Sequence, residues 1–165
     1  GPTEQWEQRY SGVEGWHLPG GDTYQRWHDE EMAAIVEALA PSGLPLLVLD
    51  APTVGRNPRD DGTTPERVAA WNAQIDRWDA AWTPVVEVPY AFVWAHPRTP
   101  AGRAERPDGV HATPERMAEV ARTHLVAALV EALESVRAEM RATGCLVGVG
   151  AEMRLQPERC RVDSA

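Results

Sequence analysis

An aspartate and a histidine stand three residues apart in the segment 106–114, which reads Arg-Pro-Asp-Gly-Val-His-Ala-Thr-Pro. Gly109 makes a tight turn easy between them, and such a turn brings the Asp108 carboxylate within reach of the His111 imidazole. The carboxylate can then bind one ring nitrogen and leave the other free to take a proton. The pattern predicts an acid–base pair in which His111 is the general base. The competing interpretation is an aspartate that caps a turn beside a surface histidine.

The composition is that of an ordinary globular domain. The chain has 165 residues, about one domain, of which 43% are hydrophobic and 25% charged, and no apolar run is long enough for a membrane span. All 16 basic residues are arginines, and 25 acidic residues give a formal net charge of -9. Phosphate binding needs a positive stripe, so we expect no nucleic-acid partner.

Helical and strand patterns alternate from residue 22 to residue 88. Asp22 is expected to cap a helix that runs to about Ala40, and the apolar run 44–49 predicts a buried strand. A second helix is expected to begin at residues 63–66, and its apolar face is Val68, Trp71, Ile75, Trp78 and Trp82. Val85–Val88 then predicts another strand. This order favours a right-handed parallel crossover and an α/β fold.

A third helix is expected to open at Thr113 and to end at Gly144. Its predicted core side is Met117, Val120, Leu125, Leu129, Leu133, Val136 and Met140. We assign the domain to residues 1–142, because the tail 143–165 shows no persuasive pattern. Cys145 and Cys160 in that tail either close a small disulfide loop in an oxidising compartment or remain two separate thiols.

The predicted sheet is short of strands. Three helices flank only two strands, whereas a sheet usually has about four to six. A helix near residue 22 with no strand before it indicates that one or more strands precede Gly1, so that the domain is truncated at its N-terminus. Reactive residues of open α/β sheets gather beyond the carboxyl ends of strands, here in residues 50–64 and 89–113. The acid–base pair lies in the second loop, and residues 53–63 are a candidate lid.

Other histidines and tryptophans have structural interpretations that compete with functional ones. His28 and His124 are expected at the edges of buried helix faces, while His17 and His96 stand beside tryptophans in loops, where packing competes with a place in a substrate cleft. Candidate sugar-stacking platforms are Trp6, Trp16 and Trp94. A metal site would need His96 to converge with the acid–base pair. We expect no metal and no cofactor.

The block Arg106-Pro-Asp-Gly-Val-His111-Ala-Thr-Pro, followed by a long amphipathic helix, resembles the last motif block of the SGNH (GDSL-like) hydrolase superfamily. Residues 46–52, the polar loop and the helix bearing Trp71-Asn72 resemble the middle of that domain. They are most similar to the form attached to membrane acyltransferases that modify bacterial surface polysaccharides. The start of the chain, Gly1-Pro2 with Trp6-Glu7, resembles the segment after that family's third strand. The resemblance covers about residues 1–135.

This resemblance implies a three-layer α/β/α sandwich with a parallel, flavodoxin-like sheet. It also implies a serine esterase or O-acyltransferase that acts on acyl esters of carbohydrate, acetyl esters foremost. His111 is then the catalytic base and Asp108 orients it, while a glycine, an asparagine and the serine amide hold the oxyanion. The implied partners are a carbohydrate or acyl-ester substrate and a fused membrane acyltransferase domain, and the implied location is extracytoplasmic or the cell envelope.

The nucleophile half of such a site is missing from the sequence. The family's serine stands in a Gly-Asp-Ser turn after the first strand, and the nearest triplet here, Gly21-Asp22-Thr23, begins a helix. The chain's four serines, Ser11, Ser42, Ser135 and Ser164, lie in other settings, and Asn57 and Asn72 are poor substitutes for the oxyanion asparagine. We therefore expect the serine upstream of this chain. The alternatives are a non-catalytic binding or scaffold module and a small stand-alone protein of unrelated function.

Overall fold

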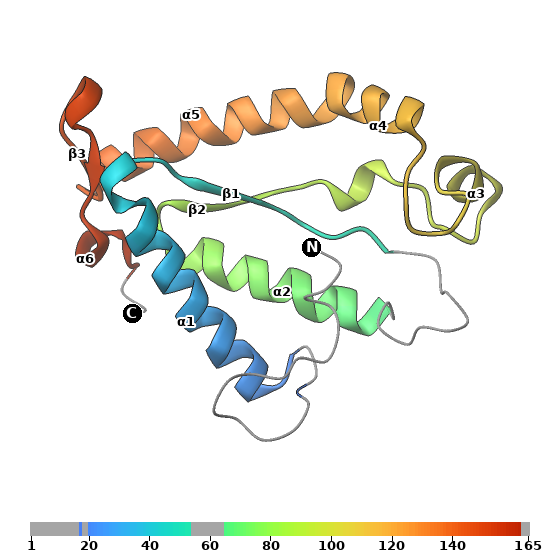
Figure 1. Ribbon diagram of the computed structural model, residues 1–165, viewed down its shortest axis with the longest axis horizontal. Helices are drawn as coiled ribbons and strands as arrows, with labels where there is room; N and C mark the ends of the chain where they lie inside the picture. Colours follow the sequence, from blue (N-terminus) through green and yellow to red (C-terminus); the bar gives the residue numbers. More distant parts are fainter. Residues whose placement is uncertain (1–16, 18–19, 54–64, 163–165) are drawn as a thin grey trace.

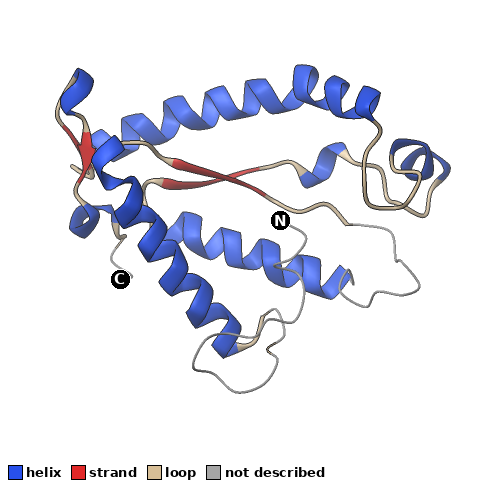
Figure 2. Ribbon diagram, in the orientation of Figure 1, coloured by secondary structure: helices blue, strands red, loops and turns tan. Residues whose placement is uncertain are grey.

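Two parallel strands, β1 (Leu46–Leu49) and β2 (Val85–Val88), run between helices in the computed structural model, which describes residues 17, 20–53 and 65–162 (Figure 1). The helices are α1 (Asp22–Leu39), α2 (Pro65–Ala81), α3 (Pro100–Glu105), α4 (Pro114–Val120), α5 (Val126–Ala142) and α6 (Pro157–Cys160). Shorter turns are η2 (Ala40–Ser42), η4 (Ala91–Val93), η6 (Gly150–Glu152) and the π turn η5 (Ala121–Leu125). A second pair of strands consists of β3 (Leu146–Val147) and β4 (Arg154–Leu155), as Figure 2 shows.

The predicted strand, helix and strand unit is confirmed. β1 and β2 pair in parallel, with Leu46 opposite Val85 and Leu49 opposite Val88. The connecting helix α2 lies on one side of the strands together with α1, and α5 lies on the other side (Figure 1). The fold is therefore mixed α/β with a small parallel sheet. The wider sheet of the predicted three-layer sandwich is not found among the described residues.

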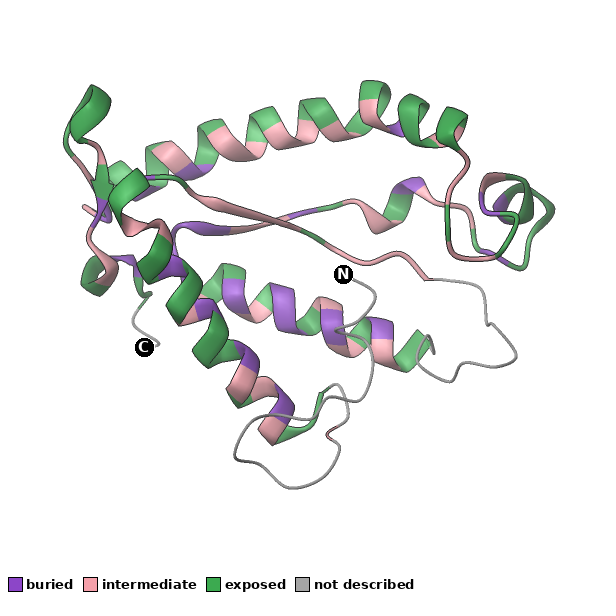
Figure 3. Ribbon diagram, in the orientation of Figure 1, coloured by how far each residue is buried: buried purple, intermediate pink, exposed green. Residues whose placement is uncertain are grey.

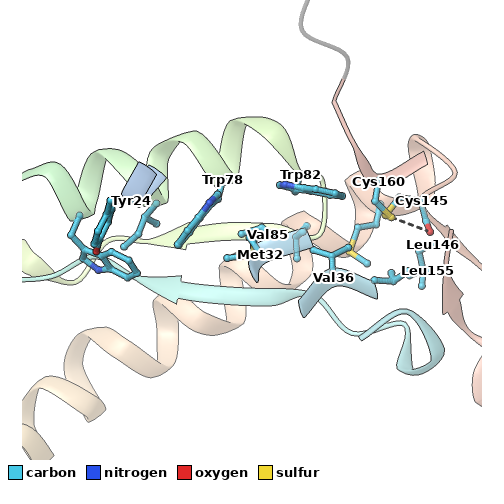
Figure 4. Close-up of a cluster of buried hydrophobic side chains, with 14 residues drawn as sticks. Tyr24, Met32, Val36, Trp78, Trp82, Val85, Cys145, Leu146, Leu155 and Cys160 are labelled. Carbon is cyan, nitrogen blue, oxygen red and sulfur yellow. Dashed lines mark hydrogen bonds between the residues drawn. A yellow bond between two sulfur atoms is a disulfide. The ribbon is translucent and has the colours of Figure 1, made fainter. Parts of the chain in front are cut away.

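The predicted apolar face of the second helix is confirmed, because Val68, Trp71, Ile75, Trp78 and Trp82 are all buried (Figure 3). Most of this face joins one hydrophobic cluster, whose buried members are Tyr24, Met32, Val36, Trp71, Ile75, Trp78, Trp82, Val85, Val136, Met140, Cys145, Leu146, Leu155 and Cys160 (Figure 4). His28 lies among the aromatic rings of this region, with its ring centre 4.3 Å from that of Tyr24 and 5.7 Å from that of Trp71. Its predicted place at a buried helix face is therefore confirmed.

Helix α1 is capped by Gly21, so the predicted capping role of Asp22 is wrong. The Gly21 carbonyl accepts the N–H of Gln25 at 2.9 Å, which is the first helical hydrogen bond, and no side chain caps this end. Asp22 is instead the first helical residue. Its negative charge there is favourable beside the positive end of the helix dipole.

The third helix is confirmed as three joined parts, α4, η5 and α5, that run without a break from Pro114 to Ala142. Thr113 caps its start, because the Thr113 side chain accepts the backbone N–H of Arg116. Gly144 follows its end in the left-handed conformation, with a φ of 75°. This geometry favours glycine, as the sequence predicts.

The apolar face of this helix departs from the prediction at several positions. The π turn η5 adds a residue to one turn and so shifts the face that follows. Val120, Val136 and Met140 are buried as predicted, but Met117 is 41% exposed and His124 is also exposed. Predicted core members Leu125, Leu129 and Leu133 are only partly buried, because two strands cover only part of so long a helix. Among the described residues, no helix has the length and apolar character that crossing a membrane requires.

The segment after Gly144 packs into the same core as the helices, although its sequence shows no clear pattern. β3 and β4 pair antiparallel, and the Thr83 N–H donates to the Cys160 carbonyl at 2.8 Å. Cys145 and Cys160 are fully buried and form a disulfide (Figure 4). Of the two predicted alternatives, the structure therefore contains the disulfide and not two separate thiols.

Replacing Cys145 and Cys160 together by alanine should destabilise the protein. The disulfide closes a loop with a sequence separation of 15, and a bridge over a loop of that size contributes about 3 kcal/mol to the free energy of unfolding. We expect a loss of that order in chemical denaturation. Reductant should lower the Tm of the wild type and leave the Tm of the double variant unchanged. A wild type whose Tm does not respond to reductant would contradict the bridge.

Glu87 on β2 faces a group of carboxylates. Its backbone N–H donates to Asp79 Oδ1 at 3.2 Å, and its carboxyl group shares a hydrogen bond with that of Asp76. Burial, this hydrogen bond and the negative charges of Asp76, Asp50 and Asp79 raise the pKa of Glu87 from 4.5 to about 7. The folded protein therefore retains a proton that the unfolded chain releases. The contribution of the protonated Glu87 to the free energy of unfolding is full below pH 4.5 and is lost as the pH rises through about 7.

Glu87→Gln should remove this pH dependence of stability. We expect the variant to be more stable than the wild type above pH 7 by about 1 kcal/mol, because glutamine carries no charge to repel the neighbouring carboxylates. Urea denaturation across pH measures the difference. Glu139→Gln, at an exposed position of α5, is the matched control and should keep the wild-type profile. Parallel profiles for wild type and Glu87→Gln would show that Glu87 does not carry this effect.

Candidate active site

The acid–base pair lies in a closed loop between α3 and α4. The Thr113 N–H donates to the Glu105 carbonyl at 2.9 Å and so closes the base of the loop. Within it, the Gly109 N–H donates to the Arg106 carbonyl at 2.8 Å, and Gly109 has a φ of 83°. A residue with a side chain rarely adopts that φ, so glycine is suited to this turn.

The turn brings Asp108 and His111 into direct contact. Asp108 Oδ2 lies 2.6 Å from His111 Nδ1, while Asp108 Oδ1 accepts the backbone N–H groups of Val110 and His111 at 2.8 and 2.7 Å. The carboxylate thus caps its own turn and holds the imidazole at the same time. The two interpretations of the sequence pattern are therefore compatible, and the predicted contact is present.

The hydrogen bonds to Asp108 keep its carboxyl group ionised and determine the tautomer of the neutral His111 ring. The bond with the His111 side chain and the two backbone bonds lower the pKa of Asp108 from 3.8 to about 2. Since a carboxylate can only accept, Nδ1 of His111 carries the proton of the neutral ring, and Nε2 presents a lone pair. The His111 side chain is 83% exposed, so this lone pair is accessible from outside. Such an arrangement can act as a general base.

Buried and partly buried charged groups attach this loop to the rest of the molecule. Arg106 is 2% exposed, and its guanidinium donates to the carbonyls of Thr53 and Ala95 at 2.8 and 2.7 Å. Glu105 accepts the N–H of Ala95 at 2.9 Å and pairs with Arg116 Nε at 3.0 Å. The acid–base pair is therefore held against the loops that follow β1 and β2, as the α/β pattern predicts.

The same edge of the sheet contains a hollow of about 380 Å³. Its lining includes Ala51, Thr53, Asn72, Phe92, Trp94 and His96. The Asn72 amide donates to the carbonyl of Ala51 and accepts the N–H of the same residue, at 3.0 and 2.8 Å. Asn72 therefore stabilises the end of β1.

The structure does not bring a serine to His111 within its described part. Ser42 lies before β1, where its hydroxyl donates to the Leu39 carbonyl, and Ser135 is exposed on α5. Ser11 and Ser164 lie outside the described residues, as do Trp6, Trp16 and Asn57. The candidate lid 53–63 also lies outside them except for Thr53.

Of the remaining candidates, Trp94 and His96 line the hollow at this edge. Trp94 has the guanidinium carbons of Arg106 and Arg116 at 5.7 and 5.8 Å from its ring centre, which favours packing over sugar stacking. His17 is partly buried, and His96 is exposed with Nδ1 3.3 Å from the backbone N of Arg98. Within the described ranges, no three His, Cys, Asp or Glu side chains gather as a metal site requires, so His96 does not join the acid–base pair.

Arg106 is the site residue that the sequence analysis missed. Its neighbour Pro107 and the following aspartate mark a turn, but nothing in the pattern predicts a buried guanidinium. Helix α3 was missed as well, although Thr99-Pro100 is a typical start. The Thr99 side chain accepts the N–H of Gly102 at 3.0 Å and so caps this helix.

Comparison of the chain with protein-family models, with curated proteins and with solved structures finds no match.

His111→Ala should raise the pKa of Asp108 from about 2 toward 3.8, because the largest cause of the low pKa is the bond to the His111 side chain. The two backbone hydrogen bonds remain, so the rise is partial. Carboxyl-carbon NMR titration measures it, and His96→Ala serves as the control that should not move it. A pKa of Asp108 that stays at the wild-type value in His111→Ala would show that the two side chains do not interact.

Proposed function

We propose that this chain supplies the acid–base half of a serine esterase or O-acyltransferase of the SGNH type. The observation that supports this most is the contact of 2.6 Å between Asp108 and His111, in a turn anchored at the carboxyl edge of a parallel strand pair. The resemblance of the block 106–114 to the SGNH motif is the reason for proposing ester hydrolysis or acyl transfer as the reaction. The three-layer sandwich and a nucleophilic serine upstream of Gly1 are part of the same proposal.

The proposed reaction has two half-reactions. The serine hydroxyl attacks the carbonyl carbon of an acyl ester while Nε2 of His111 takes its proton, and Asp108 stabilises the imidazolium. The tetrahedral adduct then expels the alcohol, which receives that proton from His111. The acyl-serine next reacts with water or with a sugar hydroxyl, whose proton goes to His111 and then to the departing serine oxygen. Hydrolysis and transfer differ only in that acceptor.

The proposed substrate is an acyl ester of carbohydrate, acetyl foremost, and the proposed partner is a membrane acyltransferase domain in the same polypeptide. The buried bridge between Cys145 and Cys160 supports an extracytoplasmic location, because structural disulfides persist in oxidising compartments.

A second candidate function is a non-catalytic binding or scaffold module. The observation that favours it is the lack of a serine near His111 among the described residues, where Ser42 and Ser135 lie in other elements. In that case the acid–base pair only shapes its turn.

Turnover by the full-length native gene product tests the proposal. We expect it to hydrolyse 4-nitrophenyl acetate, and we expect His111→Ala to lower kcat/KM by a factor of roughly 100 to 10,000, because a general base contributes about that much. Asp108→Asn should also lower it by removing the negative charge that holds the imidazolium. His124→Ala is the matched control, since His124 is exposed and its ring centre lies 6.1 Å from that of Phe92. Wild-type turnover in His111→Ala would overturn the catalytic assignment.

A further inference from the structure

Arg106 is a buried cation that forms no ion pair with a carboxylate among the described residues. Its side chain is bound by the carbonyls of Thr53 and Ala95, and burial lowers the pKa of Arg106 while the charge of Glu105 opposes that effect. Removing a guanidinium from water costs several kcal/mol, and an apolar side chain would fill the same space at lower cost. The cost of burying an arginine here therefore suggests that its two hydrogen bonds have a specific role.

The backbone of Arg106 belongs to the turn of the acid–base pair. Its carbonyl accepts the N–H of Gly109 at 2.8 Å, and Asp108 follows two residues later. Its side chain reaches the loop after β1 through Thr53 and the loop after β2 through Ala95. One residue thus connects the turn to both loops at the carboxyl edge of the sheet. A planar guanidinium suits this task because its nitrogens donate in two fixed directions.

The contacts of Asp108 form the acid–base pair, whereas those of Arg106 place it in the molecule. The bonds of Asp108 to Val110 and His111 span at most three residues, so the pair forms from its own turn. The bonds of Arg106 span 53 and 11 residues, so they place that turn relative to the sheet. Removing the guanidinium should let the turn move relative to the sheet, while the contact between Asp108 and His111 remains.

We propose that Arg106 is a positioning residue, which holds the formed acid–base pair at the carboxyl edge of the sheet so that Nε2 of His111 meets the nucleophile. Its effect on catalysis rests on the proposed function, whereas its effect on the turn does not. A misplacement of about 1 Å can cost a factor of about 100 in rate, so a displaced but intact pair should be a poor catalyst.

Arg106→Met tests this placement, with Arg103→Met on the exposed side of α3 as the matched control. We expect backbone NMR order parameters of Gly109, Val110 and His111 to fall from about 0.85 to below about 0.6 in Arg106→Met, and to stay high in the control. The pKa of Asp108 should remain at about 2 in both variants, because the pair is still formed. In the full-length native product, kcat should fall by about 10 to 100-fold with little change in KM.

Arg106→Lys is the second variant, in case Arg106→Met does not fold. Lysine keeps the charge but presents a single nitrogen in place of the two-pronged guanidinium, so the order parameters should fall to intermediate values. Unchanged order parameters in a folded Arg106→Met would overturn the proposal, and so would a pKa of Asp108 near 3.8 in that variant, because the pair itself would then depend on Arg106. Loss of folding in both variants would also overturn it. A wild type without esterase activity would refute the proposed function and leave the order-parameter test standing.

Discussion

Side chains that bond to main-chain groups hold the carboxyl ends of β1 and β2 together. Two strands of four residues form too short a ladder to fix the loops that leave them. Asp50, Asn72 and Arg106 hold these loops in place. Asp50 and Asn72 each make two hydrogen bonds to the backbone of one loop, and Arg106 makes one to each of two loops. Hydrogen bonds of partly buried charged groups are stronger than neutral ones and fix direction, so the loops keep a defined geometry.

The position of the exposed acid–base pair depends on these connections, whereas its internal geometry comes from its own turn. Asp108 and His111 are on the surface, where a contact between two polar side chains alone adds little stability. Their geometry is instead imposed by backbone bonds within the turn and by the base of the loop between Glu105 and Thr113. The pair can therefore remain open to a nucleophile and a substrate while its position stays fixed. This combination suits a base that serves a nucleophile from another segment.

Local patterns in the sequence predict the helices, the two strands and the acid–base pair. The period of the tryptophan face of α2 and the spacing of Asp108, Gly109 and His111 are local signals, and the structure contains both features. The exposure of Met117 was not predictable, because it depends on which part of the long helix the short sheet covers, and no local period encodes this. The burial of Arg106 and the packing of the tail depend on partners far away in sequence, which no local period encodes.

Reaction of the full-length native product with a fluorophosphonate, followed by mass spectrometry of the labelled peptide, decides whether the acid–base pair serves a nucleophile. The proposed function leads us to expect one labelled serine, at a rate that falls at least about 100-fold in His111→Ala, because activation of the hydroxyl needs the base. A native product that takes up no label, or one whose labelling rate is the same without His111, would contradict an acyl-transfer role for this site.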